Sequence, residues 1–184
     1  MRGIEASLND IISAMFIIKK DAKEGIDILS VSETSDIYHP TTPDPEADEV
    51  IKAINMALKE ARLKPEDIDY INAHGTGTIA NDIMEANAIN NIFPNTPVSS
   101  TKPMTGHCLG AAAGIELALC AKLIDNFEGY LYPHMYDNFF DESLPKINLV
   151  KKNKKYEKCN ICMCTSFGFS GTNAIAIIGK NNEQ

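Results

Sequence analysis

The sequence predicts an α/β fold, with a mostly parallel central sheet flanked by helices and a β-hairpin at its C-terminal end. Two observations support this prediction. Runs of β-branched residues alternate with segments whose apolar residues recur at helical spacing, and this alternation is typical of a parallel sheet with helices on its faces. Near the end of the chain, two β-rich runs flank a glycine-containing turn instead, which is the pattern of a hairpin.

In the first half of the chain, predicted helices and strands alternate. Residues 1–25 carry apolar residues at helical spacing, so we expect one amphipathic helix there. Residues 26–32 alternate and are rich in β-branched residues, which predicts a strand. After a proline-rich loop, the apolar positions of residues 46–62 lie on one side of a predicted helix. The next predicted strand covers residues 68–74 and runs into Gly75.

The second half repeats the alternation. We expect a helix over residues 80–92 and a short strand over residues 98–100. A long helix is predicted over residues 105–124, and its many small residues would let other backbones approach closely, so we expect it to be packed on all sides. The two strands of the hairpin are expected at residues 159–166 and 172–178.

Composition and charge exclude several classes of protein. The chain has 184 residues and a formal net charge of −8, from 17 basic and 25 acidic residues, and it has no basic stripe, so we expect no nucleic-acid partner. No run of about 18 apolar residues occurs, so no membrane span is expected. The apolar run at residues 11–18 lacks a basic start and a small-residue cleavage site, which argues against a secretion signal. Five cysteines, clustered late, fit reduced thiols and a cytoplasmic location.

The first stretch with unusual residue choices is His74-Gly-Thr76-Gly-Thr78. His74 ends a predicted strand, and ligands of open α/β sheets gather at the carboxyl ends of strands. Thr76 and Thr78 offer hydroxyls just before a predicted helix, where backbone N–H groups also point outward, so the pair suits a phosphate or a polar, extended ligand. The alternative is a turn with capping threonines and one hydrogen-bonded histidine, and both interpretations stay open.

The second stretch places His107 at the start of a predicted helix, five residues after Lys102. A helix N-terminus and a nearby ammonium both disfavour the imidazolium form, so we expect His107 to be neutral near pH 7. A neutral imidazole can donate an N–H to a carbonyl that gains negative charge. Helix capping would explain one histidine, but two histidines at the ends of elements in consecutive units favour a function. Glu116, on the same predicted helix, needs a partner if buried, and Lys102 is the candidate.

The third stretch is a glycine turn around Phe169. Glycines on both sides allow a strained turn whose N–H points into a cavity, as in one half of an oxyanion hole, and a plain hairpin turn explains the run equally well. Just before it, Cys159-x-x-Cys162-x-Cys164 contains half of a zinc pattern, but no second pair follows. We therefore expect no metal site and keep a metal-binding module only as a distant third alternative.

Taken together, the stretches Asp69–Thr78, Val98–His107 and Ser166–Asn173 resemble the β-ketoacyl-acyl-carrier-protein synthases. These ketosynthases are the decarboxylating enzymes of fatty acid and polyketide assembly, and they have the thiolase fold. The order and spacing of the three stretches agree with the family, and a segment at residues 35–41 resembles it as well. The resemblance implies that residues 26–184 form a thiolase-like C-terminal ketosynthase domain. Residues 1–25 resemble nothing that can be placed.

The resemblance implies a catalytic role for five residues. The family condenses a cysteine-bound acyl group with malonyl-carrier protein, with loss of carbon dioxide. His74 and His107 would assist decarboxylation and stabilise the enolate at the thioester carbonyl. Lys102 would organise the site together with Glu116. Phe169 would gate the pocket, and its N–H would complete an oxyanion hole.

The resemblance also implies how the substrate is held. Hydroxyl groups would hydrogen-bond the pantetheine arm of the acyl carrier protein, and no other cofactor is implied; these groups belong to Thr41, Thr76 and Thr78. Asp82 and Glu85 match family positions on the following helix. Thr165 stands where the family usually has Asn, and Ser170 stands where it usually has Gly, which would alter details of the site or of the turn.

The resemblance covers only the C-terminal half of the family. In a complete synthase the N-terminal half carries the nucleophilic cysteine, and none of the five cysteines here falls in the corresponding place. The implied partners are acyl carrier protein and either an N-terminal half that supplies this cysteine or a second copy of the chain, because the sheet would otherwise expose a large apolar face. The alternative function is a non-catalytic scaffold or carrier-protein-binding module with the same fold.

Overall fold

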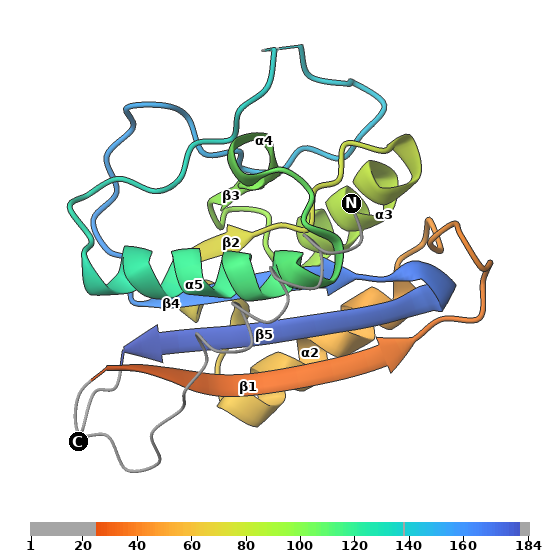
Figure 1. Ribbon diagram of the computed structural model, residues 1–184, viewed down its shortest axis with the longest axis horizontal. Coiled ribbons are helices and arrows are strands. Elements are labelled where there is room, and N and C mark those ends of the chain that lie inside the picture. Colours follow the sequence, from red (N-terminus) through yellow and green to blue (C-terminus); the bar gives the residue numbers. More distant parts are fainter. Residues whose placement is uncertain (1–24, 138, 181–184) are drawn as a thin grey trace, which may run out of the picture.

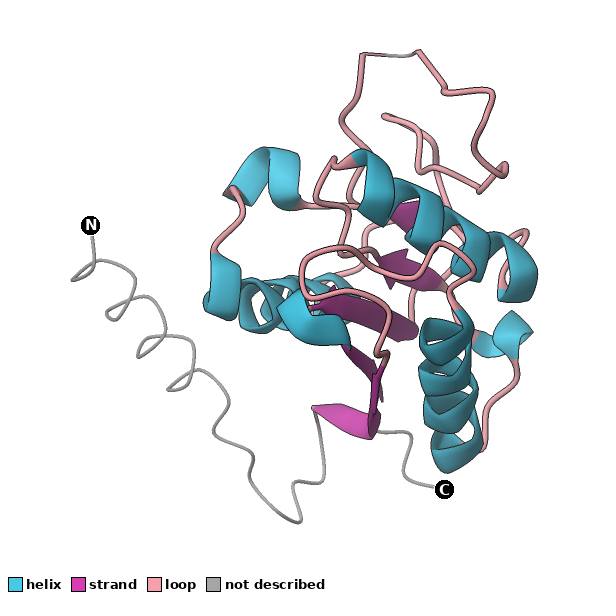
Figure 2. Ribbon diagram, turned by 90° about the vertical axis from the view of Figure 1, so that its right-hand side faces the viewer, coloured by secondary structure: helices cyan, strands magenta, loops and turns pink. Residues whose placement is uncertain are grey.

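Five strands form one sheet in the order β1-β5-β4-β2-β3, and helices lie on both of its faces (Figures 1 and 2). The computed structural model describes residues 25–137 and 139–180. The helix predicted over residues 1–25 therefore lies outside the described residues, apart from Gly25. The α/β class predicted from the sequence is confirmed. No helix of the described segments is long and apolar enough to cross a membrane.

The sheet is mixed, which corrects the prediction of a mostly parallel one. The long strand β5 (Thr172–Lys180) pairs antiparallel with both β1 (Ile26–Ser35) and β4 (Ile161–Phe167). Only the short strands β2 (Tyr70–Asn72) and β3 (Val98–Ser99) continue the sheet in parallel beyond β4. A short turn joins β4 to β5, and such a turn requires antiparallel pairing, so the predicted hairpin is confirmed.

Three long helices cover the sheet. The predictions for residues 46–62 and 80–92 are confirmed by α2 (Asp48–Ala61) and α3 (Ile79–Ile92). The third helix, α5, covers Ala112–Asp125. The residues that α5 buries recur on one side of the helix; they are Ala112, Glu116, Cys120, Leu123 and Ile124.

The prediction of a continuous helix over residues 105–124 is wrong in its first third. A short helix, α4 (Lys102–Thr105), ends at Gly106, whose φ of +78° lies in the left-handed region that glycine adopts readily. A 3-10 turn over Leu109–Ala111 then leads into α5. His107 consequently lies in the connection between two helices and not at the start of one. Because much of α5 outside its buried stripe is only half-buried, the expectation that it is packed on all sides is also wrong for the described residues.

A separate apolar core lies on each face of the sheet. On the face of α2 and α3, fully buried side chains include Ile54, Ile71 and Met163. On the face of α5, Cys120 and Ile124 pack against sheet residues, which include Tyr70, Cys162 and Cys164. The two cores hold the carboxyl ends of β2 and β3 rigidly between them, and the residues after those strands form the candidate site.

Side-chain hydroxyls join β1 to α2. In the second half of β1, alternate residues are buried and carry hydroxyls. Ser30, Ser32 and Thr34 donate hydrogen bonds to the carbonyls of Ala57, Ala53 and Glu49 at 2.8, 2.7 and 2.7 Å. Two residues of a strand span roughly 6.7 Å and four residues of a helix roughly 6 Å. Every second residue of β1 can therefore meet every fourth residue of α2 over these three hydrogen bonds.

We expect Ser32→Ala to lower the free energy of unfolding by about 0.5–1.5 kcal/mol, because it removes one buried hydrogen bond while the carbonyl of Ala53 remains within its helix. Urea denaturation followed by circular dichroism measures the change. Ser35→Ala is the matched control at the exposed end of the same strand and should change stability by less than about 0.5 kcal/mol. Equal effects of the two substitutions would contradict a structural role for the hydroxyls.

Candidate active site

Four of the residues predicted from the sequence converge beyond the ends of β2 and β3. His74 follows β2, Lys102 begins α4, His107 lies between α4 and α5, and Glu116 is on α5. The imidazole rings of His74 and His107 are 5.7 Å apart between centroids and nearly perpendicular. The ammonium of Lys102 lies 3.4 Å from Nδ1 of His74 and forms an ion pair with Glu116.

The ion pair between Lys102 and Glu116 is buried. Lys102 is 7% exposed and Glu116 1% exposed, so each charge requires the other, as the sequence predicted. Burial raises the pKa of Glu116 to about 7, and the hydrogen bond and charge of Lys102 oppose this rise. Oε1 of Glu116 receives the ammonium, whereas its Oε2 is buried without a hydrogen-bond partner among the described residues.

Both histidines use Nδ1 as an acceptor. Nδ1 of His74 receives the ammonium of Lys102, and Nδ1 of His107 receives the backbone N–H of Leu109 at 3.3 Å. A neutral imidazole with Nδ1 engaged as an acceptor carries its proton on Nε2. Each ring therefore retains one N–H donor, at Nε2, for a ligand.

Both rings are held in the neutral form. Burial lowers the pKa of His74 to about 3, and the charge of Lys102 acts in the same direction. For His107, burial and then Lys102 lower the pKa. The sequence predicted the direction for His107 and the contribution of Lys102. It was wrong about the helix N-terminus, because His107 lies outside both neighbouring helices.

The turn after His74 is held by residues that the sequence analysis did not assign to this task. Glu85 of α3 accepts the backbone N–H groups of His74 and Gly75, at 2.8 and 2.7 Å. Thr165 of β4 also accepts the N–H of His74, at 2.9 Å. Gly75 has a φ of +43°, and a Cβ there would lie 2.5 Å from the Cβ of Ser100, so only glycine fits this turn. The resemblance matched Glu85 to a family position, but no sequence pattern indicated these contacts.

The three threonines lie toward the surface. The hydroxyls of Thr76 and Thr78 are 3.1 Å apart, and Thr78 also accepts the backbone N–H of Asn81 at 3.4 Å as the cap of α3. The capping alternative thus holds for Thr78, while a ligand role for either residue stays a prediction. Thr41 is exposed and pairs with Nδ1 of His39 at 3.3 Å.

The turn around Phe169 is tied to the segment that contains Thr41. The backbone N–H of Ser170 donates to the carbonyl of Pro40 at 2.9 Å, and Gly171 accepts the N–H of Asp36 at the same distance. Ser170 has a φ of 65°, which is costly for a residue other than glycine. The side chain of Phe169 is 79% exposed. Its role as a gate stays a prediction.

The late cysteines and Cys120 form a buried thiol cluster. Sγ of Cys159 lies 3.5 Å from that of Cys162, and Sγ of Cys164 lies 3.5 Å from that of Cys120. All four belong to the core beneath α5. Within the described segments, no group of three or more His, Cys, Asp or Glu residues could hold a metal ion. The alternative of a metal-binding module therefore has no geometric support.

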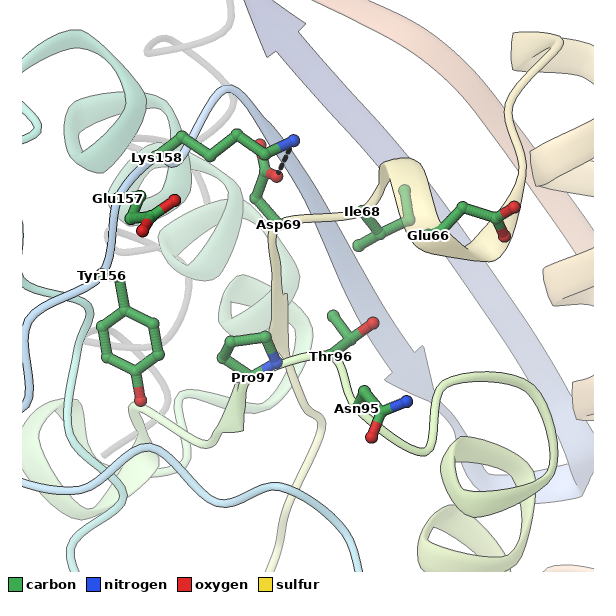
Figure 3. Close-up of a pocket in the computed structure, with 9 residues that line it drawn as sticks. All are labelled: Glu66, Ile68, Asp69, Asn95, Thr96, Pro97, Tyr156, Glu157 and Lys158. Carbon is green, nitrogen blue, oxygen red and sulfur yellow. Dashed lines mark ion pairs between the residues drawn. The ribbon is translucent and has the colours of Figure 1, made fainter.

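Two hollows of the surface lie apart from the two histidines. One, of about 350 Å³, lies before the start of β2, where Lys158 pairs with Asp69 at 2.8 Å (Figure 3). Another, of about 520 Å³, is lined by loop residues that include His134 and Lys151. Neither is lined by His74 or His107, and His107 is itself exposed. Among the convergent residues, His107 is exposed, whereas His74, Lys102 and Glu116 are buried.

Comparison with known proteins shows the same family throughout. The family described as "Beta-ketoacyl synthase, C-terminal domain" matches residues 27–133. The chain is 36% identical over 163 residues to the chloroplastic 3-oxoacyl-[acyl-carrier-protein] synthase I of Hordeum vulgare, which covers 87% of this chain and 35% of that protein. The chain thus spans about a third of the length of this relative.

Two solved structures extend the comparison. A ketosynthase from Xenorhabdus doucetiae, in complex with its chain length factor, is 43% identical with a TM-score of 0.81, over 88% of this chain and 40% of that one. A ketosynthase in complex with its type II polyketide acyl-carrier protein is 28% identical with a TM-score of 0.75, over 84% and 38%. The thiolase-like fold implied by the resemblance is therefore confirmed.

We expect Lys102→Met to raise the pKa of His74, because it removes the neighbouring positive charge, while burial keeps the value below 6.5. Titration of the imidazole signals by NMR measures the shift. The control is Lys52→Met, which removes an exposed lysine paired with Glu49 on α2 and should leave His74 unchanged. An unchanged pKa in Lys102→Met would show that Lys102 does not help to hold the ring neutral.

Proposed function

The chain belongs to the β-ketoacyl synthase family, whose C-terminal domain it contains, and we propose that it supplies the histidine side of a decarboxylating condensation site. The substrate would be a malonyl thioester carried on the phosphopantetheine arm of an acyl carrier protein, with no further cofactor. The bond between the carboxylate and the α-carbon breaks, carbon dioxide leaves, and the electron pair forms an enolate. The nucleophilic cysteine that holds the acyl group would come from another polypeptide segment.

The observation that carries this proposal is the convergence of two neutral imidazoles. His74 and His107 each retain an Nε2–H donor, and their rings are 5.7 Å apart. When the malonyl group loses carbon dioxide, negative charge develops on the thioester oxygen. Two N–H donors directed at that oxygen stabilise the charge without any proton transfer. Lowered pKa values keep both rings in the form that this role requires.

Lys102 and Glu116 act as positioning residues in this proposal. The ammonium of Lys102 holds Nδ1 of His74, so it fixes both the ring and the position of its proton. Glu116 compensates the charge of Lys102 in the buried interior. The pair therefore prepares His74 before any substrate binds.

The hydroxyls and the aromatic turn serve the substrate. Thr76 and Thr78 follow His74 directly and lie toward the surface, where they would hydrogen-bond the amides of the pantetheine arm. Thr41 would join them from the segment that is tied to the turn of Phe169. Phe169 would gate the entrance, and its backbone N–H would belong to the oxyanion hole of the acyl thioester. The neighbour that was solved with its acyl-carrier protein supports a carrier-borne substrate.

The partner that completes the site would be an N-terminal ketosynthase half. Large apolar side chains next to site residues are exposed, namely Ile79, Leu109 and Phe169. The match covers 35% of the curated relative, so the remainder of a protein of that kind is large enough to cover these side chains. Self-association of the chain is the alternative occupant, and sedimentation with and without an added N-terminal half distinguishes the two.

We expect the 184-residue chain to release carbon dioxide from malonyl-carrier protein, and His107→Ala to reduce this release by about 10²–10³-fold, the typical cost of losing one donor to an oxyanion. Release of radiolabelled carbon dioxide measures the rate. Lys52→Met, far from the site, is the control that should retain the rate.

Two results would contradict this prediction. An equal rate in His107→Ala would contradict the role of this ring. If the folded chain releases nothing, the assay is repeated with an added N-terminal half. Failure there as well would favour a scaffold or carrier-binding function.

A further inference from the structure

The position of the His74 ring depends on its main chain. The ring receives a hydrogen bond from Lys102 and makes edge contacts with the rings of His107 and Phe167, with centroids 5.7 and 5.4 Å away. Because His74 lies between the end of β2 and the left-handed Gly75, the peptide units on its two sides set the position from which the ring reaches Lys102.

Two buried side chains hold those peptide units. Oε1 of Glu85 accepts the N–H of His74 at 2.8 Å, and Oε2 accepts the N–H of Gly75 at 2.7 Å. The hydroxyl of Thr165 accepts the same His74 N–H at 2.9 Å. That hydroxyl has one proton, and it donates it to Oε1 of Glu85 at 2.6 Å. The direction of each hydrogen bond is therefore fixed.

The contacts to the turn at His74 and Gly75 come from three separate parts of the chain. Glu85 is on α3, Thr165 is on β4, and Ser100, which follows β3, donates its hydroxyl to the carbonyl of Gly75 at 3.2 Å. Thr165 is 1% exposed and Glu85 5% exposed, so neither is available to a substrate. Burial raises the pKa of Glu85, and its four donors, the first of which is Thr165, oppose that rise.

We propose that Thr165 and Glu85 form a clamp on the main chain of His74 and act as positioning residues for the decarboxylation proposed above. Thr165 contributes through its hydroxyl, which bridges the His74 N–H to the Glu85 carboxylate, and not through its shape. The inference rests on the proposed function for its catalytic meaning. The clamp itself is a property of the chain that can be measured without turnover.

The test compares Thr165→Val with Thr165→Ser in the 184-residue chain. Valine keeps the shape and removes the hydroxyl, whereas serine keeps the hydroxyl. Thr34→Val is the matched control, because it removes another buried hydroxyl, on β1, whose partner is the carbonyl of Glu49 and not the site. NMR measures amide exchange at His74 and Gly75 and the imidazole shifts of His74, and the release of carbon dioxide gives kcat and KM.

We expect Thr165→Val to accelerate amide exchange at His74 by about tenfold or more relative to Thr34→Val, as loss of a hydrogen bond to a charged network predicts. The His74 imidazole shifts should move, and kcat should fall while KM stays the same, because no substrate contact is lost. Thr165→Ser should behave as wild type. Exchange in Thr165→Val equal to that in Thr34→Val, or a Thr165→Ser variant as impaired as the valine variant, would overturn the clamp.

Two further arms separate folding and function from the clamp. If Thr165→Val does not fold, Glu85→Gln replaces one acceptor oxygen by a donor and should accelerate exchange at His74 or Gly75; unchanged exchange there would refute the proposal. If exchange changes as expected but no variant, nor wild type, releases carbon dioxide, the proposed function fails and the clamp stands. If wild type and Thr165→Val release carbon dioxide at the same rate and show the same amide exchange at His74, the clamp fails and the proposed function stands.

Discussion

The site depends on one buried ion pair, between Lys102 and Glu116. Each of these side chains would be an isolated charge in the interior without the other, and removal of one partner from a buried pair is far more costly than the pair is worth. The pair joins α4 to α5 across the break at Gly106, and its ammonium reaches the ring of His74. The same ion pair therefore links α4 to α5, balances two buried charges and helps to keep the His74 imidazole neutral.

The scaffold beneath this pair works by fixing backbone positions. The cores on the two faces of the sheet hold the ends of β2 and β3, and side chains from α3 and β4 both accept the backbone N–H of His74. The polar groups engaged in this way are buried, so they are satisfied by each other and leave the surface to Thr76, Thr78 and His107. The residues that position the site are thus buried, and the residues that can contact a ligand lie at the surface.

The sequence predicted the elements, and the side chains that converge at the candidate site, better than it predicted their arrangement. His74, Lys102, His107 and Glu116 were singled out from local order, spacing and the family resemblance, and the structure brings them together, while their catalytic role stays a prediction. The break in the helix before α5 was missed, since small residues at helical spacing do not reveal that Gly106 adopts a positive φ. The contact of Thr165 with His74 joins residues 91 positions apart, so it depends on β2 pairing with β4, which no local pattern encodes.

The exposure of His107 has a consequence for the chemistry that the candidate site would perform. An enolate formed on an uncovered surface meets bulk water at once, and protonation by water competes with carbon–carbon bond formation. The described surface alone would then turn a malonyl thioester into an acetyl thioester, whereas a covered site excludes water and preserves the carbanion for its acyl partner. A covering segment would thus decide which product leaves, in addition to supplying a nucleophile.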